Sequence, residues 1–352
     1  MRWLTLLLAP LLGLATAASA SAAPQVAGQQ SARTTFQVRD LGNLGDAESG
    51  PSSANAVNSR GVVAGTTRNA DGLERAFQWD PLTGAMTDLG TLGGFASQGS
   101  GINDRGQVVG AADTASGETH AFRWDPSTGT MTDLGTLGGA TSRAFAINNR
   151  GEVVGESTTT AGLSHAFRWD PRTGQMTDLG TLGGDFSQAL DVNQRGQIVG
   201  AAATAEGLLH AFLWQPVTGR MNDLGVLPGT IVSFARGINE RGQVVGSAAD
   251  VDEGSSRAFL WSPRTGTMLE IAGVGGPSEA RAINDVGAVV GVRAVAGGFH
   301  AFLAIPVAAS VVDLPGLAGG DAEAHDINNA FHIVGTARAA NGQFAAVLWT
   351  PA

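Results

Sequence analysis

The chain of 352 residues contains neither cysteine nor lysine, and both absences narrow what it can be. Without cysteine it has no disulfide and no thiol for lipid attachment, so its stability must come from burial. All positive charge comes from arginines, which are spread along a chain of formal net charge −10. Nucleic-acid binding and polybasic membrane anchoring both require a basic cluster, so we expect neither kind of partner.

Long hydrophobic runs are also missing, apart from one short run near the N-terminus. Arg2, Leu4–Leu14 and the A-x-A site at 18–20 have the pattern of a secretory signal peptide. The apolar run is too short to span a bilayer. We therefore predict a signal peptide over residues 1–20, cleaved after Ala20 or Ala22. The mature protein is expected to be exported, extracellular or periplasmic, without membrane insertion.

A unit of about 45 residues repeats seven times along the rest of the chain. Each unit has an Asn in an element like I-N-x-x-G and, shortly after it, a Gly that ends a V-V-G-like tripeptide. The Asn positions are Asn58, Asn103, Asn148, Asn193, Asn239, Asn284 and Asn328. The Gly positions are Gly65, Gly110, Gly155, Gly200, Gly246, Gly291 and Gly335. A period of this length indicates a solenoid, a propeller or a similar array.

Each unit predicts four short β-strands, as the third unit (142–180) illustrates. No window shows helical periodicity, and the runs rich in β-forming residues are separated by turn signals. N-N-R-G at 148–151 and D-P-R-T-G at 170–174 have the residues of tight hairpin turns. Phe167 and Trp169 lie two residues apart, hence on one face of the third strand. This pair recurs in most units, and we expect it to pack between neighbouring sheets.

The register of the last strand indicates that the repeats close into a ring. A D-L-G element marks this strand, and one copy, at 40–42, precedes the first complete unit, while the final unit stops before its own copy. Segment 36–42 would therefore complete the last sheet, which closes a ring but has no use in an open solenoid, the alternative considered. We predict an all-β fold: a seven-bladed β-propeller of four-stranded blades over residues 34–352, preceded by a flexible segment at 21–33.

The tripeptide His-Ala-Phe, at 120–122, 165–167, 210–212 and 300–302, and Arg-Ala-Phe, at 75–77 and 257–259, give the chain a family resemblance. It resembles the HAF-repeat proteins, a family of extracellular bacterial repeat proteins. The resemblance covers residues 34–352 and implies export and a repeat architecture, but no particular chemistry. The W-D-P-x-T-G turns are also similar to those of kelch repeats.

The recurring histidines invite a metal-binding interpretation, which two observations oppose. The equivalent position is Arg75 in the first unit and Arg257 in the fifth, and arginine does not ligate metals. What arginine shares with histidine is the capacity to donate hydrogen bonds. Equivalent positions in neighbouring sheets should also lie about 10 Å apart, whereas zinc requires ligands at about 2 Å. We expect these side chains to be structural donors to a group in their own blade, and we predict no metal site among them.

Asp250, Asp252 and Glu253 form an acidic loop that resembles half of a calcium-binding loop. The third Asp and the distal Glu of an EF-hand loop are missing, so a solvated acidic loop is the favoured interpretation and calcium the alternative. No other cofactor is predicted.

Function on a repeat scaffold is expected where the units differ, and they differ most along the first strand. Three residues before the Asn, the units have Asn55, Ser100, Phe145, Leu190, Arg236, Arg281 and His325. Five residues before it, they have Ser53, Gln98, Arg143, Gln188, Phe234, Glu279 and Glu323. Both rows should ring one mouth of the central channel if the first strand is innermost.

Charged groups concentrate at this mouth in units five to seven. The candidate ligand-binding residues are Arg236, Glu279, Arg281, Glu323, His325 and Asp326. Paired guanidinium groups suit a carboxylate, sulfate or phosphate. Alternatively, the Arg and Glu side chains only neutralise one another around a wet channel.

We predict a binding or interaction module, expected to be monomeric, for an anionic or glycan ligand. One alternative is a propeller enzyme acting on a carbohydrate or another polyhydroxylated substrate, with Glu279, Glu323 and His325 as catalytic groups. Another is a structural surface or matrix protein. Fold alone does not decide among them.

Overall fold

The computed structural model describes residues 35–45, 50–250 and 256–352. The predicted signal peptide at 1–20 and the segment at 21–33 lie outside these residues. So do Asp252 and Glu253 of the acidic loop. Among the described residues, no helix is long and apolar enough to cross a membrane.

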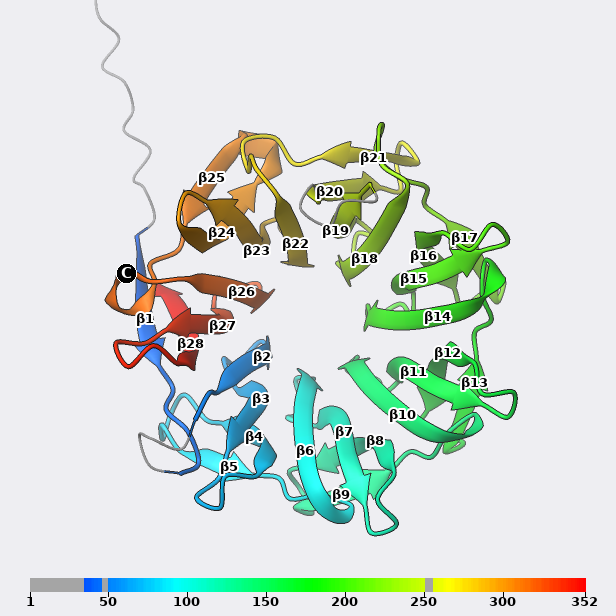
Figure 1. The fold of residues 1–352 in the computed structure, drawn as a ribbon, viewed down its shortest axis with the longest axis horizontal. Helices are drawn as coiled ribbons and strands as arrows, with labels where there is room; N and C mark the ends of the chain where they lie inside the picture. The colour runs from blue at the N-terminus through cyan, green and yellow to red at the C-terminus, as the bar shows by residue number, and fades with distance from the viewer. Residues whose placement is uncertain (1–34, 46–49, 251–255) are drawn as a thin grey trace, which may run out of the picture. The chain divides into compact units, whose positions relative to one another are not determined.

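Within the described ranges, 28 strands form seven four-stranded antiparallel sheets arranged as blades around a central channel (Figure 1). Blade 1 comprises β2 (Ser53–Val57), β3 (Val63–Arg68), β4 (Glu74–Trp79) and β5 (Met86–Asp88). Blade 2 comprises β6 (Gly93–Ile102), β7 (Val108–Thr114), β8 (Thr119–Asp125) and β9 (Thr130–Asp133). Blade 3 comprises β10 (Gly138–Ile147), β11 (Val153–Thr159), β12 (Ser164–Asp170) and β13 (Gln175–Asp178).

Blades 4 to 7 follow the same plan. Blade 4 comprises β14 (Gly183–Val192), β15 (Ile198–Thr204), β16 (Leu209–Gln215) and β17 (Arg220–Asp223). Blade 5 comprises β18 (Val232–Ile238), β19 (Val244–Ala249), β20 (Arg257–Ser262) and β21 (Thr267–Glu270). Blade 6 comprises β22 (Ser278–Ile283), β23 (Val289–Val295), β24 (Gly298–Ile305) and β25 (Ser310–Asp313), with short 3-10 turns η2 (Pro306–Ala308) and η3 (Leu317–Gly319) near its outer strand. Blade 7 comprises β26 (Ala322–Ile327), β27 (Ile333–Arg338), β28 (Phe344–Pro351) and β1 (Phe36–Asp40).

The ring closes as the sequence predicts, because β1 is the outer strand of the blade that the C-terminus builds. Val38 lies opposite Trp349 in an antiparallel ladder, and the amide of Leu41 continues the pairing with the carbonyl of Ala346. The seven-bladed propeller of four-stranded blades is thus confirmed, and the open solenoid is excluded.

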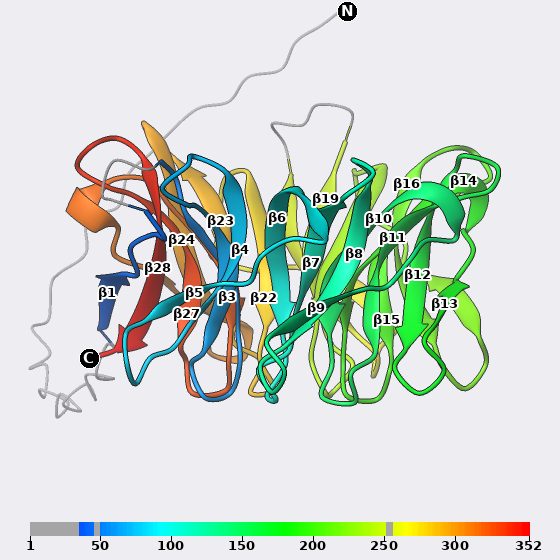
Figure 2. The same ribbon diagram turned by 90° about the horizontal axis from the view of Figure 1, so that it is seen from below.

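The first strand of each blade lies innermost, so its residues line the channel (Figure 1). The strands run along the channel axis in the side view (Figure 2). Since neighbouring strands are antiparallel, the turns after the first and third strands of each blade lie at one end of the channel. The loops after the second and fourth strands lie at the other end. We call this second end the entry mouth, and the first the far mouth.

The repeated aromatic pair packs between blades, as expected. Phe212 and Trp214 of blade 4 share a hydrophobic cluster with Val154 and Ala166 of blade 3. The Phe side chains of the pair are fully buried, and the Trp side chains are at most 8% exposed. The recurring Gly serves the same packing, because a Cβ atom at Gly155 would lie 1.9 Å from the carbonyl oxygen of Arg143. Any side chain there would push the innermost strand off the blade.

A closed ring of hydrogen bonds between the seven recurring Asn residues links the blades. The side-chain amide of each Asn donates to the backbone carbonyl of the Asn in the next blade, at 2.9–3.2 Å, and Asn328 completes the ring by donating to Asn58. The Asn side-chain oxygen also accepts amide hydrogens of its own turn, as Asn193 does from Arg195 and Gln197. One residue type therefore both shapes the turn and fixes the neighbouring blade.

Candidate functional site

A β-bulge in the innermost strand of every blade presents one residue to the channel. The bulge adds one residue to the innermost strand opposite its neighbour. In each blade the register shift falls on the same repeat position. The extra residues are Asn55, Ser100, Phe145, Leu190, Arg236, Arg281 and His325. They are the first variable row identified in the sequence, so the regular fold offers its most variable side chains to the channel.

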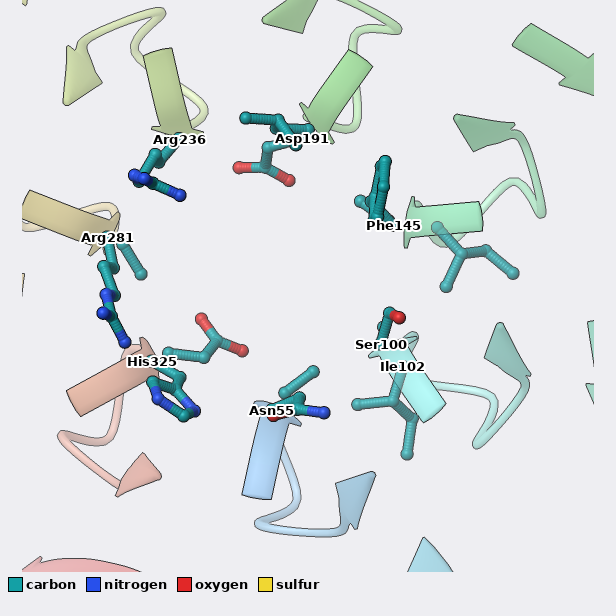
Figure 3. Close-up of a pocket in the computed structure, with 15 residues that line it drawn as sticks. Asn55, Ser100, Ile102, Phe145, Asp191, Arg236, Arg281 and His325 are labelled. Carbon is teal, nitrogen blue, oxygen red and sulfur yellow. The ribbon is translucent and has the colours of Figure 1, made fainter. Parts of the chain in front are cut away.

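Two overlapping cavities occupy the channel on this side. A cavity of about 220 Å³ at the entry mouth is lined by six of the bulge residues. A deeper cavity of about 160 Å³, which we call the waist, adds His325, Asp191 and Asp326 to the lining. Arg236, Arg281 and His325 lie on one side of the channel, and Ser100 and Phe145 on the other (Figure 3). The entry mouth is therefore half charged and half small or apolar.

The charged half is a chain of ion pairs that crosses three blades. Glu279 Oε2 lies 3.4 Å from Arg236 Nη2 and 3.7 Å from Arg281 Nε. Arg281 Nη1 lies 2.5 Å from Glu323 Oε2, which is also 3.6 Å from His325 Nε2. The structure thus brings together five of the six predicted site residues. It places the two Arg and His325 in the cavity lining, whereas the two Glu hold them from outside it.

Neighbouring charges and burial set the protonation of this chain. The contact with His325, aided by Arg281, lowers the pKa of Glu323 to about 2 although burial opposes it. Burial lowers the pKa of His325, whose Nδ1 lies 3.0 Å from the carbonyl oxygen of Ala54. At neutral pH Glu323 is therefore ionised and His325 is neutral. The sequence-based expectation that His325 gains charge near pH 6.5 is corrected by this burial.

Arg236 has unused hydrogen-bonding capacity. Its Nε is buried and has no hydrogen-bond partner among the described residues, and its nearest carboxylate contact is the 3.4 Å approach to Glu279. A buried donor without a partner costs about 1–3 kcal/mol. An acceptor atom that enters the cavity would reach Nε, and remove this cost, once the Arg236 side chain rotates toward it.

Two aspartates stand at the waist, one position after the bulge. Asp326, a predicted site residue, and Asp191 occupy the same position in blades 7 and 4, where other blades have Ala or Gly. Burial raises the pKa of Asp326, and it raises the pKa of Asp191 to about 7, with a further contribution from Asp326. The waist therefore changes its charge close to neutral pH.

The far mouth has a cavity of about 280 Å³, but its polar groups are already engaged. In six blades the side-chain oxygen of the residue after the Asn accepts an amide hydrogen from the preceding blade. These residues are Asp104, Asn149, Gln194, Glu240, Asp285 and Asn329. The entry mouth is thus the better candidate for a site.

The recurring histidines are structural donors, as the sequence predicts. His165 Nδ1 lies 2.7 Å from Asp178 Oδ2 of the next strand in its own blade, and Arg257 is 3.1 Å from Glu270 in the equivalent position. The described residues contain no group of three or more His, Asp or Glu side chains placed to hold a metal ion. Of the predicted calcium loop only Asp250 is described, so the calcium alternative stays a prediction.

Sequence reasoning missed Asp191 and the Asn ring. The sequence does mark Asp191 as unusual, because the residue two positions before the recurring Asn is acidic only in blades 4 and 7. The Asn residues were noticed as turn residues, but nothing in one repeat indicates a bond to the next blade.

No known family model matches the chain, and no curated protein matches its sequence. Many solved structures resemble the fold. An oligogalacturonate lyase in complex with manganese is 13% identical, with a TM-score of 0.60 over 91% of this chain and 94% of that one. The propeller domain of the trilobed protease from Pyrococcus furiosus, which has an open velcro topology, is 10% identical, with a TM-score of 0.59 over 85% and 93%.

TolB from Acinetobacter baumannii is 15% identical, with a TM-score of 0.47, and the match covers 62% of this chain and 53% of that one. This chain therefore spans about half of that relative's length. Similarities at these identities show the propeller fold alone.

Proposed function

We propose that the protein is an exported binding module that takes a small polyhydroxylated ligand, such as a sugar, at the entry mouth. The observation that carries this proposal is Arg236, which lines the cavity and whose buried Nε has no hydrogen-bond partner among the described residues. Ligand sites are concave and combine apolar surface with a few convergent polar groups. Phe145 and Leu190 supply the apolar surface here, opposite the ion-pair chain.

Charge balance favours hydroxyl groups over a bare anion at the ion-pair chain. Arg236 and Arg281 are matched by Glu279 and Glu323, and His325 is neutral at pH 7. A hydroxyl group can donate to a carboxylate and accept from a guanidinium at the same time. A sugar therefore needs no change in the existing ion pairs, whereas an anion would compete with the two Glu for the guanidiniums.

Catalysis by the same residues has less support than binding. A general acid or base works best with a pKa near the operating pH, and the pKa of Glu323 is lowered to about 2. Glu323 therefore cannot carry a proton at neutral pH, although it lies 3.6 Å from His325.

A structural matrix role also has less support. Such a role would call for a large exposed apolar patch, and the four most exposed large apolar side chains, Leu82, Phe95, Val217 and Val307, belong to four different blades. The resemblance to HAF-repeat proteins supports export, and a monomer agrees with a ring that closes on itself.

A saccharide panel tests the proposal. Neutral mono- and disaccharides are screened against the protein by thermal shift, and hits are titrated by calorimetry. We expect at least one saturable ligand, and we expect Arg236→Gln to weaken it at least tenfold, because a hydrogen bond to a charged group contributes about 1.5–3 kcal/mol. Arg241→Gln is the matched control, since Arg241 is an exposed arginine of the same blade at the far mouth. A panel without a saturable ligand, or equal affinity in the two variants, contradicts the proposal.

A further inference from the structure

The two waist aspartates show how this channel holds a carboxylate. Asp326 Oδ1 accepts the amide hydrogen of Ile327 in its own blade at 2.8 Å, and its Oδ2 accepts that of Val57 in the next blade at 2.8 Å. Asp191 does the same with Val192 at 2.7 Å and Ile238 at 2.8 Å. Each carboxylate thus bridges two equivalent amides of neighbouring blades.

The hydrogen-bond pattern of the innermost strand turns these amides toward the channel. Every blade has this pattern, so the equivalent amide faces the channel in every blade. In an antiparallel ladder, residues alternate between pairs that exchange hydrogen bonds and pairs that do not. Asn103 donates to Gln107, so the preceding pair, Ile102 and Val108, is of the second kind. The N–H of Ile102 therefore points away from β7, and β6 has no other neighbour in its sheet than β7. The same argument applies to Ile147, because Asn148 donates to Glu152.

Blades 2 and 3 present such a pair of amides without a carboxylate of the chain. The residues at the aspartate position are Gly101 and Ala146, and both line the waist cavity together with Ile102 and Ile147. Ser100, Ile102 and Phe145 lie on the same side of the channel (Figure 3). We propose that the amides of Ile102 and Ile147 form a subsite that binds the carboxylate of a ligand in the bridging geometry of Asp191 and Asp326.

This subsite deepens the proposed function and rests on it, because the ligand enters through the same mouth. A ligand that has both hydroxyl groups and a carboxylate, a sugar acid, fits the two regions together. Its hydroxyl groups would contact the ion-pair chain on blades 5 to 7, and its carboxylate would reach the amides of blades 2 and 3. The sequence predicted an anionic or a glycan ligand, and a sugar acid belongs to both classes.

Acetate, the smallest carboxylate probe, tests the subsite without the rest of the ligand. In a ¹⁵N-labelled protein, acetate should shift the backbone amide resonances of Ile102 and Ile147 saturably, while the isosteric but neutral acetamide leaves them unchanged. The amides of Val57 and Ile238 should shift less, since Asp326 and Asp191 already bind them. Equal shifts with acetamide, or shifts confined to residues outside the waist, would overturn the subsite.

Two substitutions, each of which adds one carboxylate to the waist, distinguish the effect of its position from the effect of its charge. Ala146→Asp places a carboxylate beside the Ile147 amide, at the repeat position of Asp191 and Asp326. Its other neighbour would be the Val192 amide, which Asp191 already binds, so the variant takes one of the two amides of the subsite and should weaken acetate binding at least tenfold. Ala282→Asp adds the same charge at the same position of blade 6, and the acetate-dependent shifts of Ile102 and Ile147 should persist. Both positions already have a Cβ atom, so neither change adds one to a glycine. Equal weakening by the two variants would show that only the charge of the waist matters.

The pH dependence gives an independent check. The charged and titratable groups that face the waist are Asp191, Asp326, His325, Arg236 and Arg281, with Glu279 and Glu323 behind the arginines. Glu240, at the far mouth, also acts on Asp191. Between pH 8 and pH 6 acetate stays ionised, Glu323 stays ionised, and the arginines stay charged. Asp191 takes up a proton near pH 7, so a negative charge leaves the waist and acetate should bind more tightly at pH 6. Tighter binding at pH 8 contradicts the assignment.

The two proposals fail under different results. If acetate shifts the amide resonances of Ile102 and Ile147 but no saccharide binds, the carboxylate subsite stands and the sugar site at the entry mouth is rejected. If a neutral saccharide binds in an Arg236-dependent way but acetate shifts no amide resonance at the waist, the sugar site stands and the subsite is rejected.

Discussion

His165 and its equivalents in other blades illustrate what a comparison of repeats can establish about a single residue. In its own blade His165 pairs with Asp178, and Arg75 and Arg257 make the equivalent contact to Asp88 and Glu270. The function shared by His and Arg, donation of a hydrogen bond, was predicted from the sequence because the two alternate at one position.

The hydrogen bond between His165 and Asp178 predicts different effects on stability for two substitutions at His165. His165→Arg should leave the free energy of unfolding nearly unchanged, because Arg can still reach the Asp178 carboxylate. His165→Leu should lower it by about 1 kcal/mol, the net value of one hydrogen bond, since Asp178 is 40% exposed and water can replace the lost donor. Urea denaturation of both variants measures the difference. If Arg and Leu destabilise the protein equally, the shared-donor interpretation is wrong.

Asp191 shows where prediction from single residues stopped. Its acidic character was visible in the sequence, but its position depends on the bulge at Leu190, which shifts the register of the innermost strand. A bulge changes which face a side chain points to, and no repeat of apolar residues marks it. The bridging of two amides could therefore be read only from the structure.

At the scale of strands and loops, a serine near the start of the innermost strand ties each of six blades to the blade before it. Ser187 of blade 4 accepts the amide hydrogen of Ala166 at 2.8 Å and donates to the carbonyl of Gly180 at 2.6 Å, both in blade 3. Ser52, Ser97, Ser142, Ser233 and Ser278 accept an amide hydrogen in the same way. Ala322 stands at this position in blade 7.

Ser187→Ala tests this contact between blades. The substitution leaves the buried amide of Ala166 without its acceptor, so the free energy of unfolding should fall by about 1–3 kcal/mol. Ser127→Ala is the matched control, because Ser127 is exposed and bonds only within its own turn. Its effect should stay within about 0.5 kcal/mol. Chemical denaturation that finds equal losses for both variants would show that the serine contact adds nothing across the blades.

At the scale of the whole molecule, the period and the offset of the D-L-G copies were enough to predict the number of blades and the way the ring closes. Both follow from counting along the chain. The bonds that join the blades were not predictable in this way. The Asn ring connects residues 44 to 46 positions apart, or 270 for the last bond, and a repeated residue looks the same whether it bonds within its unit or to the next one.

Closure of the ring rests on one short strand, and its removal gives the last prediction. β1 covers the outer edge of β28, places Leu41 in the hydrophobic cluster between blades 7 and 1, and holds the Arg39 guanidinium 4.9 Å from the Trp79 ring. Deletion of residues 34–45 would expose the edge of β28 and remove these contacts. Unpaired edges promote association, so we expect a lower melting temperature and aggregation that increases with protein concentration. Deletion of residues 21–33, which precede the described propeller, is the control and should change neither property. Calorimetry and light scattering measure both, and a monomeric deletion variant with the full melting temperature would mean that the ring holds without β1.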